Sequence, residues 1–228
     1  MSLPSTAAVA ATLSAMSGPN ALGLVMPAEI KLRTRRHVVC ALACLPWVAL
    51  AQPPAVGRKV EGQQFDAVAQ VAGTELRLNG AGVRAVAWFK AFAAGLYLAR
   101  PARSAQEATA LAGPKRLQLR MLRELPAVEF NKAVHKGVAR NVSVAQLQAL
   151  QVRLDQFGAQ VDALGQLKSG DVVDLDHEPG RGMAMKLNGT LRGVAIEGDD
   201  FYVALLLSFL GERPYDPKLK ASLLGLSP

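Results

Sequence analysis

The chain has 228 residues, half of them hydrophobic, and a formal net charge of +8 at pH 7. This length and hydrophobic content are typical of one folded domain with a sizeable core, and they exclude a chain that is disordered throughout. From Gln52 onward the basic residues are scattered rather than clustered, and aromatic residues make up only 5% of the chain. We therefore expect no nucleic-acid partner.

Residues 1–51 are predicted to be an N-terminal extension with a signal peptide at residues 26–51. A basic stretch, KLRTRR, precedes an apolar run, VVCALACLPWVAL, which is short for a membrane span and is interrupted by a proline. The run ends in the small-x-small site A-L-A, which predicts cleavage after Ala51. Residues 1–25 carry no charge and precede this signal, so we expect translation to start at Met26.

The signal peptide predicts export to the periplasm, and a retained membrane anchor is the alternative. Arg35 and Arg36 give the signal a weak likeness to a twin-arginine sequence, which leaves the export route open. Both cysteines, Cys40 and Cys44, lie inside the signal. The mature chain would therefore have no thiol for a disulfide bond or for catalysis.

The mature chain is predicted to consist of a flexible leader at residues 52–60 and one domain at residues 61–228. Apolar and other residues alternate over residues 65–78, which predicts strands. Asn79-Gly80 has the form of a hairpin turn. A long strand is expected at about residues 86–99.

Helices are predicted in the middle of the chain. Residues 102–111 indicate a short helix, and the stretch GPKRLQLRMLREL indicates a strand. Pro126 begins a helix with apolar residues at four-residue spacing. Ser143, with Gln146 three residues later, has the pattern of a capping box. The helix that follows carries an apolar stripe to Leu164, which we expect to pack on the domain's own sheet, although it could bind a partner protein.

Strands return in the last part of the chain. Residues 171–196 predict a three-stranded antiparallel meander with turns at EPG and NG. Asp199 or Asp200 is expected to cap the apolar helix FYVALLLSFLG, and Asp216-Pro217 to begin a last short helix. This order of elements predicts an α+β fold, with a largely antiparallel sheet and helices on one face.

The usual sequence signatures of catalysis are absent. The chain has no phosphate loop, dinucleotide fingerprint, nucleophile elbow or paired metal-ligand spacing, so we expect no metal and no cofactor. His135 and His177 are interpreted as surface or hydrogen-bonded residues. Asp174 and Asp176 share one face of the meander's first strand, which we interpret as a solvated face.

Several stretches, taken in order, resemble the bacterial chalcone isomerase-like proteins. They are LNGAGVR, FKAFAAGLYL, FNKAVHKGV, GTLRGVAIEG, FYVALLLSFLGERPYD and LKASLLG, and they extend over about residues 61–226. The resemblance implies an open-faced antiparallel β-sheet covered on one face by a layer of helices, which agrees with the α+β pattern.

The resemblance also implies a role for Arg84. In the plant isomerases of this superfamily, the arginine at this position stabilises the oxyanion of the substrate. The other plant site residues do not carry over, because the threonine that helps to activate the ketone falls at or near Phe92, the helix tyrosine at Phe130 and the ligand-contacting asparagine at Gly137. Losing both hydroxyl groups removes hydrogen bonds that would polarise the carbonyl. We therefore do not expect an efficient chalcone isomerase.

Other members of the fold bind fatty acids without catalysis, and in them this arginine holds the carboxylate. The resemblance therefore implies a carboxylate anchor beside an apolar cleft, because a guanidinium fork suits a carboxylate with a hydrocarbon tail. The candidate ligand-binding residues are Arg84, Phe89, Phe92, Leu96, Tyr97, Phe130 and Val134. In the alternative interpretation, simple alternation puts Arg84, Trp88 and Lys90 on one strand face, where Arg84 is only solvated or ion-paired.

Three hypotheses about function result. The first is an exported, non-catalytic and cofactor-free protein that binds an amphipathic anion such as a fatty acid. The second is an isomerase or lyase of the chalcone isomerase type that acts on an unknown carbonyl substrate, with Arg84 as the catalytic oxyanion stabiliser. The third is an accessory protein that binds a protein partner.

Overall fold

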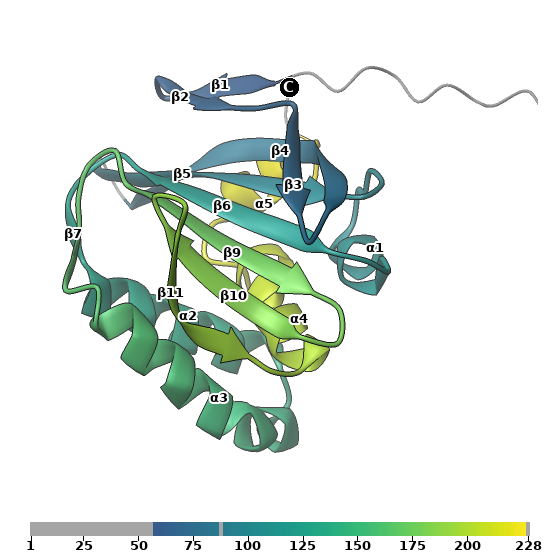
Figure 1. Cartoon of the computed structure of the whole chain (residues 1–228), viewed down its shortest axis with the longest axis vertical. Helices are drawn as coiled ribbons and strands as arrows, with labels where there is room; N and C mark the ends of the chain where they lie inside the picture. The colour runs from purple at the N-terminus through teal and green to yellow at the C-terminus, as the bar shows by residue number, and fades with distance from the viewer. Residues whose placement is uncertain (1–56, 87–88, 227–228) are drawn as a thin grey trace, which may run out of the picture. The chain divides into compact units, whose positions relative to one another are not determined.

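The computed structural model describes residues 57–86 and 89–226 of the chain. Within these residues the strands are β1 (Arg58–Val60), β2 (Gln63–Phe65), β3 (Val68–Val71), β4 (Thr74–Val86), β5 (Phe89–Leu98), β6 (Lys115–Met121), β7 (Leu125–Pro126), β8 (Gln166–Leu167), β9 (Val172–Glu178), β10 (Gly182–Leu187) and β11 (Thr190–Ile196) (Figure 1). The helices are α1 (Ala105–Ala110), α2 (Ala127–Asn141), α3 (Val144–Asp162), α4 (Asp199–Leu210) and α5 (Pro217–Leu223).

A seven-stranded antiparallel sheet forms the centre of the fold. Its strand order is β11-β10-β9-β6-β5-β4-β3, and each neighbouring pair is antiparallel. Helices α2, α3, α4 and α5 lie on one side of the sheet, with α5 against β4 and α4 against β10 (Figure 1). The predicted α+β fold, an antiparallel sheet with one helical layer, is confirmed.

The two faces of the sheet bury different sets of side chains. On the helical side, the main core contains Phe92 and Leu96 of β5 together with Phe130 and Val134 of α2. On the other face lies a smaller core, which consists of Phe65, Val71, Leu76, Ala81, Ala93 and Tyr97. Successive side chains of a strand point to opposite faces, so β5 contributes to both cores.

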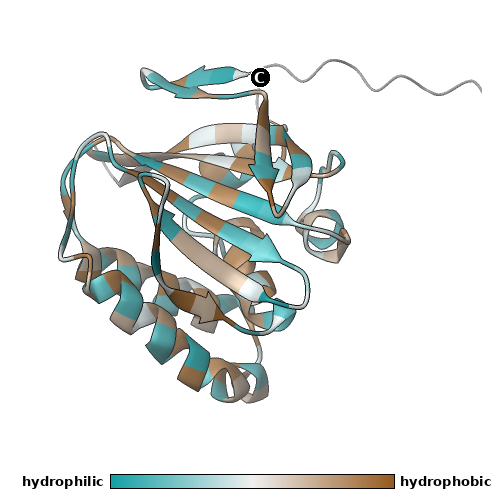
Figure 2. Ribbon diagram, in the orientation of Figure 1, coloured by the Kyte–Doolittle hydropathy of each residue, from teal (hydrophilic) through white to brown (hydrophobic). Residues whose placement is uncertain are grey.

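Helices α2 and α3 begin where the sequence predicts. Pro126 precedes the first turn of α2. The capping box of α3 is present, since Ser143 Oγ accepts a hydrogen bond from Gln146 N at 3.3 Å and Gln146 Oε1 accepts one from Ser143 N at 2.9 Å. Teal and brown alternate along α3 in Figure 2, and its apolar side, including Leu154 and Phe157, is buried.

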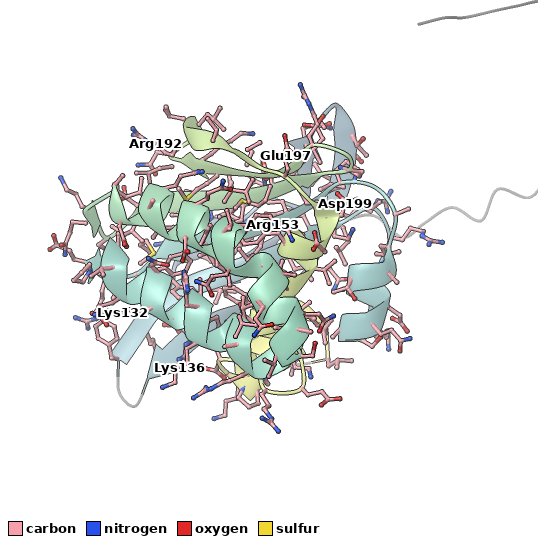
Figure 3. All side chains as sticks on the ribbon, turned by 90° about the horizontal axis from the view of Figure 1, so that it is seen from below. Lys132, Lys136, Arg153, Arg192, Glu197 and Asp199 are labelled. Carbon is pink, nitrogen blue, oxygen red and sulfur yellow. The ribbon has the colours of Figure 1, made fainter. Side chains whose placement is uncertain are left out.

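The start of α4 differs from the prediction. The N-cap is Gly198, and no side chain among the described residues caps the helix, so neither Asp199 nor Asp200 is a capping residue. Asp199 Oδ1 instead accepts a hydrogen bond from His177 Nε2 at 2.9 Å. Asp200 is ion-paired with Arg153, which points from α3 toward the start of α4 (Figure 3). These hydrogen bonds lower the pKa of both carboxyl groups. Asp199 and Asp200 therefore bind the side chains of His177 and Arg153 and do not cap the helix backbone.

Asn79-Gly80 lies inside β4 and not at a turn, so this prediction was wrong. The register of the β4–β5 pair shifts between Leu78 and Gly80. The Asn79 side-chain amide donates to the carbonyl oxygens of Ala102 at 2.9 Å and Leu223 at 2.7 Å. A side chain at position 80 would collide with the backbone at the end of α5. The pair therefore allows α5 to pack closely on β4.

The domain begins earlier than the sequence predicts. Strand β1 pairs with β2 and overlaps the end of the leader expected at residues 52–60. The rest of that leader, and the signal peptide expected at residues 26–51, lie outside the described residues. Among the helices that the structure describes, none is both long enough and apolar enough to cross a membrane.

Candidate ligand-anchoring site

Arg84 lies in β4 and faces the helical side of the sheet. It stands opposite Phe92 of β5 in the antiparallel ladder, and residues that stand opposite each other share a face. The ladder shifts its register between Arg84 and Ala85, an irregularity of the kind that redirects a side chain. The prediction that Arg84, Trp88 and Lys90 share one face of a single strand was wrong, because Arg84 lies in β4 and Lys90 in β5. Trp88 lies outside the described residues.

The guanidinium of Arg84 is half-buried and only partly paired. Its side chain is 22% exposed, and Nη1 lies 3.6 Å from Asp216 Oδ2. The same nitrogen donates a hydrogen bond to the Ala85 carbonyl at 3.2 Å, and the guanidinium carbon lies 5.7 Å from the ring centre of Tyr215. A guanidinium has five N–H donors. Most of these N–H donors therefore have no acceptor within the described part of the chain. The alternative prediction, that Arg84 is ion-paired, holds in part because Asp216 lies nearby.

Asp216 joins this region to helix α5. Its Oδ1 accepts hydrogen bonds from the backbone N–H groups of Lys218 at 2.8 Å and Leu219 at 3.2 Å, so it is the N-cap that the sequence predicts. Its Oδ2 points toward β4 and lies 3.4 Å from Ala85 N and 3.6 Å from Arg84 Nη1. One carboxylate thus holds both the start of α5 and the guanidinium.

Tyr215 packs between α2 and α4. Its ring lies edge-on to Phe209 at 5.1 Å, and a Cβ atom at Gly137 would come within 2.8 Å of its Cζ. Burial raises the pKa of Tyr215, and the neighbouring Ser208 opposes this shift. The geometry between the two hydroxyl groups is not that of a hydrogen bond. Ser208 Oγ instead donates to the Leu205 carbonyl in the backbone of α4 at 2.6 Å. The Tyr215 hydroxyl is therefore protonated at neutral pH, and it donates no hydrogen bond to the residues that the structure describes.

The predicted apolar lining is packed as core. The rings of Phe92 and Phe130 meet edge to face at 6.4 Å, and both side chains are buried. Leu96 and Val134 are fully buried, and Phe89 is half-buried against the same core. The structure thus brings these five residues together on the face that Arg84 shares, with their side chains in contact with the core and not around an open cleft.

Tyr97 does not belong to this group, and its prediction as a lining residue was wrong. It lies five residues after Phe92 in β5, and an odd separation puts two strand residues on opposite faces. Tyr97 stands opposite Arg116 of β6 and packs with Phe65 in the smaller core. Burial raises the pKa of Tyr97 to about 12, so its hydroxyl stays neutral there.

Two hollows in the described part of the chain lie away from Arg84. One of about 350 Å³ lies where the end of α2 and the start of α3 meet α4. Its lining residues are Asn141, Val142, Gln146, Ala149, Leu150, Asp200, Val203, Ala204 and Leu207. Another, of about 330 Å³, lies beside β9, β10, β11 and the turn between β3 and β4. Arg84 lines neither hollow.

Asp174 and Asp176 are buried, and the prediction of a solvated strand face was wrong. Their exposed fractions are 7% and 4%. Arg116 donates from Nε and Nη2 to the two oxygens of Asp176 at 2.5 and 2.7 Å, and Lys186 Nζ donates to Asp176 at 2.9 Å. Gln118 donates to Asp174 at 2.8 Å. The carboxylates can be buried because residues of β6 and β10 supply these donors across the sheet.

Both histidines are hydrogen-bonded, in agreement with the prediction of surface or hydrogen-bonded residues. His177 is buried, stacks on Tyr202 at 4.8 Å and is bonded to Asp199. His135 is half-buried, and its Nε2 lies 3.2 Å from the Leu154 carbonyl. Within residues 57–86 and 89–226, no group of three or more histidine, cysteine, aspartate or glutamate side chains is arranged to hold a metal ion.

Comparison with known proteins identifies the family. The chalcone isomerase-like family model matches residues 57–225, and the chain therefore belongs to the chalcone isomerase-like family. No match was found among curated proteins. The crystal structure of a fatty-acid binding protein from Arabidopsis thaliana is similar, with a TM-score of 0.53 and 16% identity over 76% of this chain and 94% of that one. At this identity the likeness shows the fold alone, and it agrees with the predicted fold class.

Sequence reasoning missed two residues beside Arg84. The stretch ERPYDPKLK gave Asp216 as a helix cap but gave no sign that its second oxygen approaches β4. Asp216 and Ala85, which its carboxylate contacts, are 131 positions apart in the chain. Tyr215 carried no signal of its own. The one available clue was Gly137, since a glycine inside a helix often marks the close approach of another side chain.

Proposed function

We propose that this protein is an exported, non-catalytic binder of an amphipathic anion such as a fatty acid, with Arg84 as the anchor for its carboxylate. The observation that carries the proposal is the guanidinium itself, which is 22% exposed and makes a single hydrogen bond to the described residues. It lies at the edge of the apolar core. A fork of charged donors beside apolar surface suits a carboxylate with a hydrocarbon tail.

The electrostatics of the guanidinium support an anionic ligand. Removing a guanidinium from water is unfavourable unless an anion pairs with it. Asp216 supplies an anion, but at 3.6 Å it is beyond the range of a charge-assisted hydrogen bond. A ligand carboxylate could instead approach Arg84 in the bidentate geometry, which gives a stronger interaction.

The apolar residues on the same face support a hydrocarbon tail. Phe92 stands opposite Arg84, and Phe130 packs on Phe92. Each methylene group that is buried there would contribute about 0.8 kcal/mol. Because the two rings are in contact, we expect them to move apart when the tail enters. The structurally similar plant protein is named a fatty-acid binding protein, which supports this class of ligand.

Export is part of the proposal and rests on the signal peptide predicted at residues 26–51. Fractionation of cells that express the full chain, followed by N-terminal sequencing, tests it. We expect a periplasmic protein that begins at Gln52. A chain that stays in the cytoplasm with its N-terminus intact would contradict export.

The enzyme hypothesis has less support. Phe92 and Phe130 stand where the resemblance to the plant isomerases would require hydroxyl groups. The hypothesis of a protein partner has no specific observation in its favour. Both remain predictions, which turnover of an enone substrate or specific co-purification would support.

Native mass spectrometry of the full-length protein, followed by titration with dodecanoate, tests the anchor. We expect the wild type to carry a fatty-acid-sized adduct and Arg84→Ala to bind dodecanoate roughly 10- to 100-fold more weakly, because hydrogen bonds to charged groups contribute about 1.5–3 kcal/mol. Arg120→Ala is the matched control, since its guanidinium also lies over an aromatic ring, that of Phe65, on the opposite face. Equal binding by the wild type and Arg84→Ala, or no binding by either, would contradict the proposal.

A further inference from the structure

We propose that Asp216 is an internal competitor for the ligand's carboxylate, and that the Tyr215 hydroxyl is a second donor to that carboxylate. The inference rests on the proposed function, because it assigns roles to two residues beside Arg84. On binding, the carboxylate of the ligand would replace the carboxylate of Asp216 beside the guanidinium of Arg84.

The two oxygens of Asp216 have separate roles. Oδ1 caps α5 through hydrogen bonds of 2.8 and 3.2 Å to Lys218 and Leu219. Among the described residues Oδ2 makes only longer contacts, 3.4 Å to Ala85 N and 3.6 Å to Arg84 Nη1. A strong charge-assisted hydrogen bond measures about 2.7–2.9 Å. The contact with Arg84 is therefore the weaker one, and a ligand can replace it while Oδ1 still caps the helix.

The Tyr215 hydroxyl makes no hydrogen bond in the described part of the chain, although Ser208 lies close to it. Its oxygen is buried without a hydrogen bond, and buried polar groups are almost always paired in native proteins. The ring lies beneath the guanidinium of Arg84, 5.7 Å from its carbon. A carboxylate that reaches Arg84 from the helical side could accept from this hydroxyl as well, and the unpaired donor would then have its partner.

The arrangement selects for the charge of the ligand. A carboxylate can displace Asp216 Oδ2 and accept from both Arg84 and Tyr215. A neutral alcohol with the same tail cannot replace a carboxylate beside a guanidinium, so it would leave the pair between Arg84 and Asp216 in place. We therefore expect dodecanoate and dodecan-1-ol to respond differently to changes at Asp216 and Tyr215.

Asp216→Asn tests the competitor. Asparagine is as good an N-cap as aspartate, so α5 keeps its cap while the competing charge is lost. By calorimetric titration of the full-length protein, we expect dodecanoate to bind about fivefold more tightly, the upper range for a weak ion pair, and dodecan-1-ol to bind unchanged. Glu212→Gln is the matched control, because it removes the same charge from an exposed residue four positions earlier, and its effect should stay below about twofold.

Tyr215→Phe tests the second donor. It keeps the ring, so the packing on Phe209 and beneath Arg84 is retained. We expect dodecanoate to bind roughly tenfold more weakly, the effect of one hydrogen bond to a charged group, while the affinity for dodecan-1-ol stays within about twofold. Thermal midpoints near that of the wild type would establish that both variants are folded.

The outcomes separate this inference from the proposed function. If Arg84→Ala weakens dodecanoate binding but Asp216→Asn and Tyr215→Phe bind it like the wild type, the inference is overturned and the anchor stands. If Asp216→Asn binds more tightly and Tyr215→Phe is unchanged, only the role of Tyr215 is overturned. If Arg84→Ala binds dodecanoate as the wild type does, the proposed function fails and this inference fails with it.

Discussion

Replacing Asp176 by alanine should destabilise the domain strongly. The Asp176 side chain is 5% exposed and that of its partner Arg116 is 12% exposed, and two hydrogen bonds of 2.5 and 2.7 Å join them. Removing the carboxylate would leave Arg116 buried, with Asp174 at 3.7 Å from its Nε as the nearest remaining anion. Breaking one side of a buried ion pair typically costs about 3–5 kcal/mol.

The structure indicates the lower end of this range for Asp176→Ala. Lys186, which also donates to Asp176, has a side chain that is 34% exposed and can turn to solvent. The retained anion, Asp174, compensates Arg116 in part. We therefore expect the free energy of unfolding to fall by about 3 kcal/mol at pH 7.

Urea unfolding, followed by circular dichroism, measures this change. Glu129→Ala is the control, because the pair of Glu129 and Lys132 is exposed on α2, and such pairs contribute about 0.5 kcal/mol or less. A loss below about 1 kcal/mol for Asp176→Ala would refute the reasoning. It would mean that the strand face is solvated, as the sequence pattern alone predicts.

Two further predictions concern tyrosine burial and helix packing. Burial raises the pKa of Tyr97 from 10.0 to about 12, so the unfolded chain releases this proton at a lower pH than the folded chain. The free energy of unfolding should therefore fall between pH 10 and 12, by roughly 3 kcal/mol for this residue. In urea unfolding across this pH range, Tyr97→Phe should lose less stability than the wild type, and the same pH profile in both proteins would contradict the prediction. A Cβ in Gly137→Ala would come within 2.7 Å of Ser208 Cβ and 2.8 Å of Tyr215 Cζ, so overpacking of about 1–3 kcal/mol should exceed the gain in helix propensity of about 1 kcal/mol. The thermal midpoint should therefore fall, and a rise would show that the ring of Tyr215 moves freely.

Local patterns in the sequence were sufficient for most of the fold. The capping box of Ser143 and Gln146 and the proline before α2 depend on neighbouring residues, so they could be predicted without knowledge of distant contacts. Asn79-Gly80 shows the limit of this reasoning. The pair has the composition of a turn, but its use depends on α5, which is more than 130 residues away in sequence.

The candidate site was predicted in part for the same reason. The prediction that Tyr97 and Phe92 line the same site could have been avoided, because residues five positions apart in one strand point to opposite faces. Asp216 and Tyr215 were not accessible in this way, since their relation to Arg84 depends on how α5 packs on β4. Charge pairing across a sheet, as around Asp176, likewise depends on strand order.

The carboxylate contact with Arg84 can be measured directly with dodecanoate labelled with ¹³C at its carboxyl group. An NMR titration of the bound ligand against pH reports the pKa of that carboxyl group. A guanidinium beside a carboxylate stabilises the ionised form, so we expect the pKa of the bound ligand to be below that of free dodecanoate in the wild type and to rise in Arg84→Ala. The same pKa in both proteins, with equal affinity, would mean that Arg84 does not hold the carboxylate and would contradict the account.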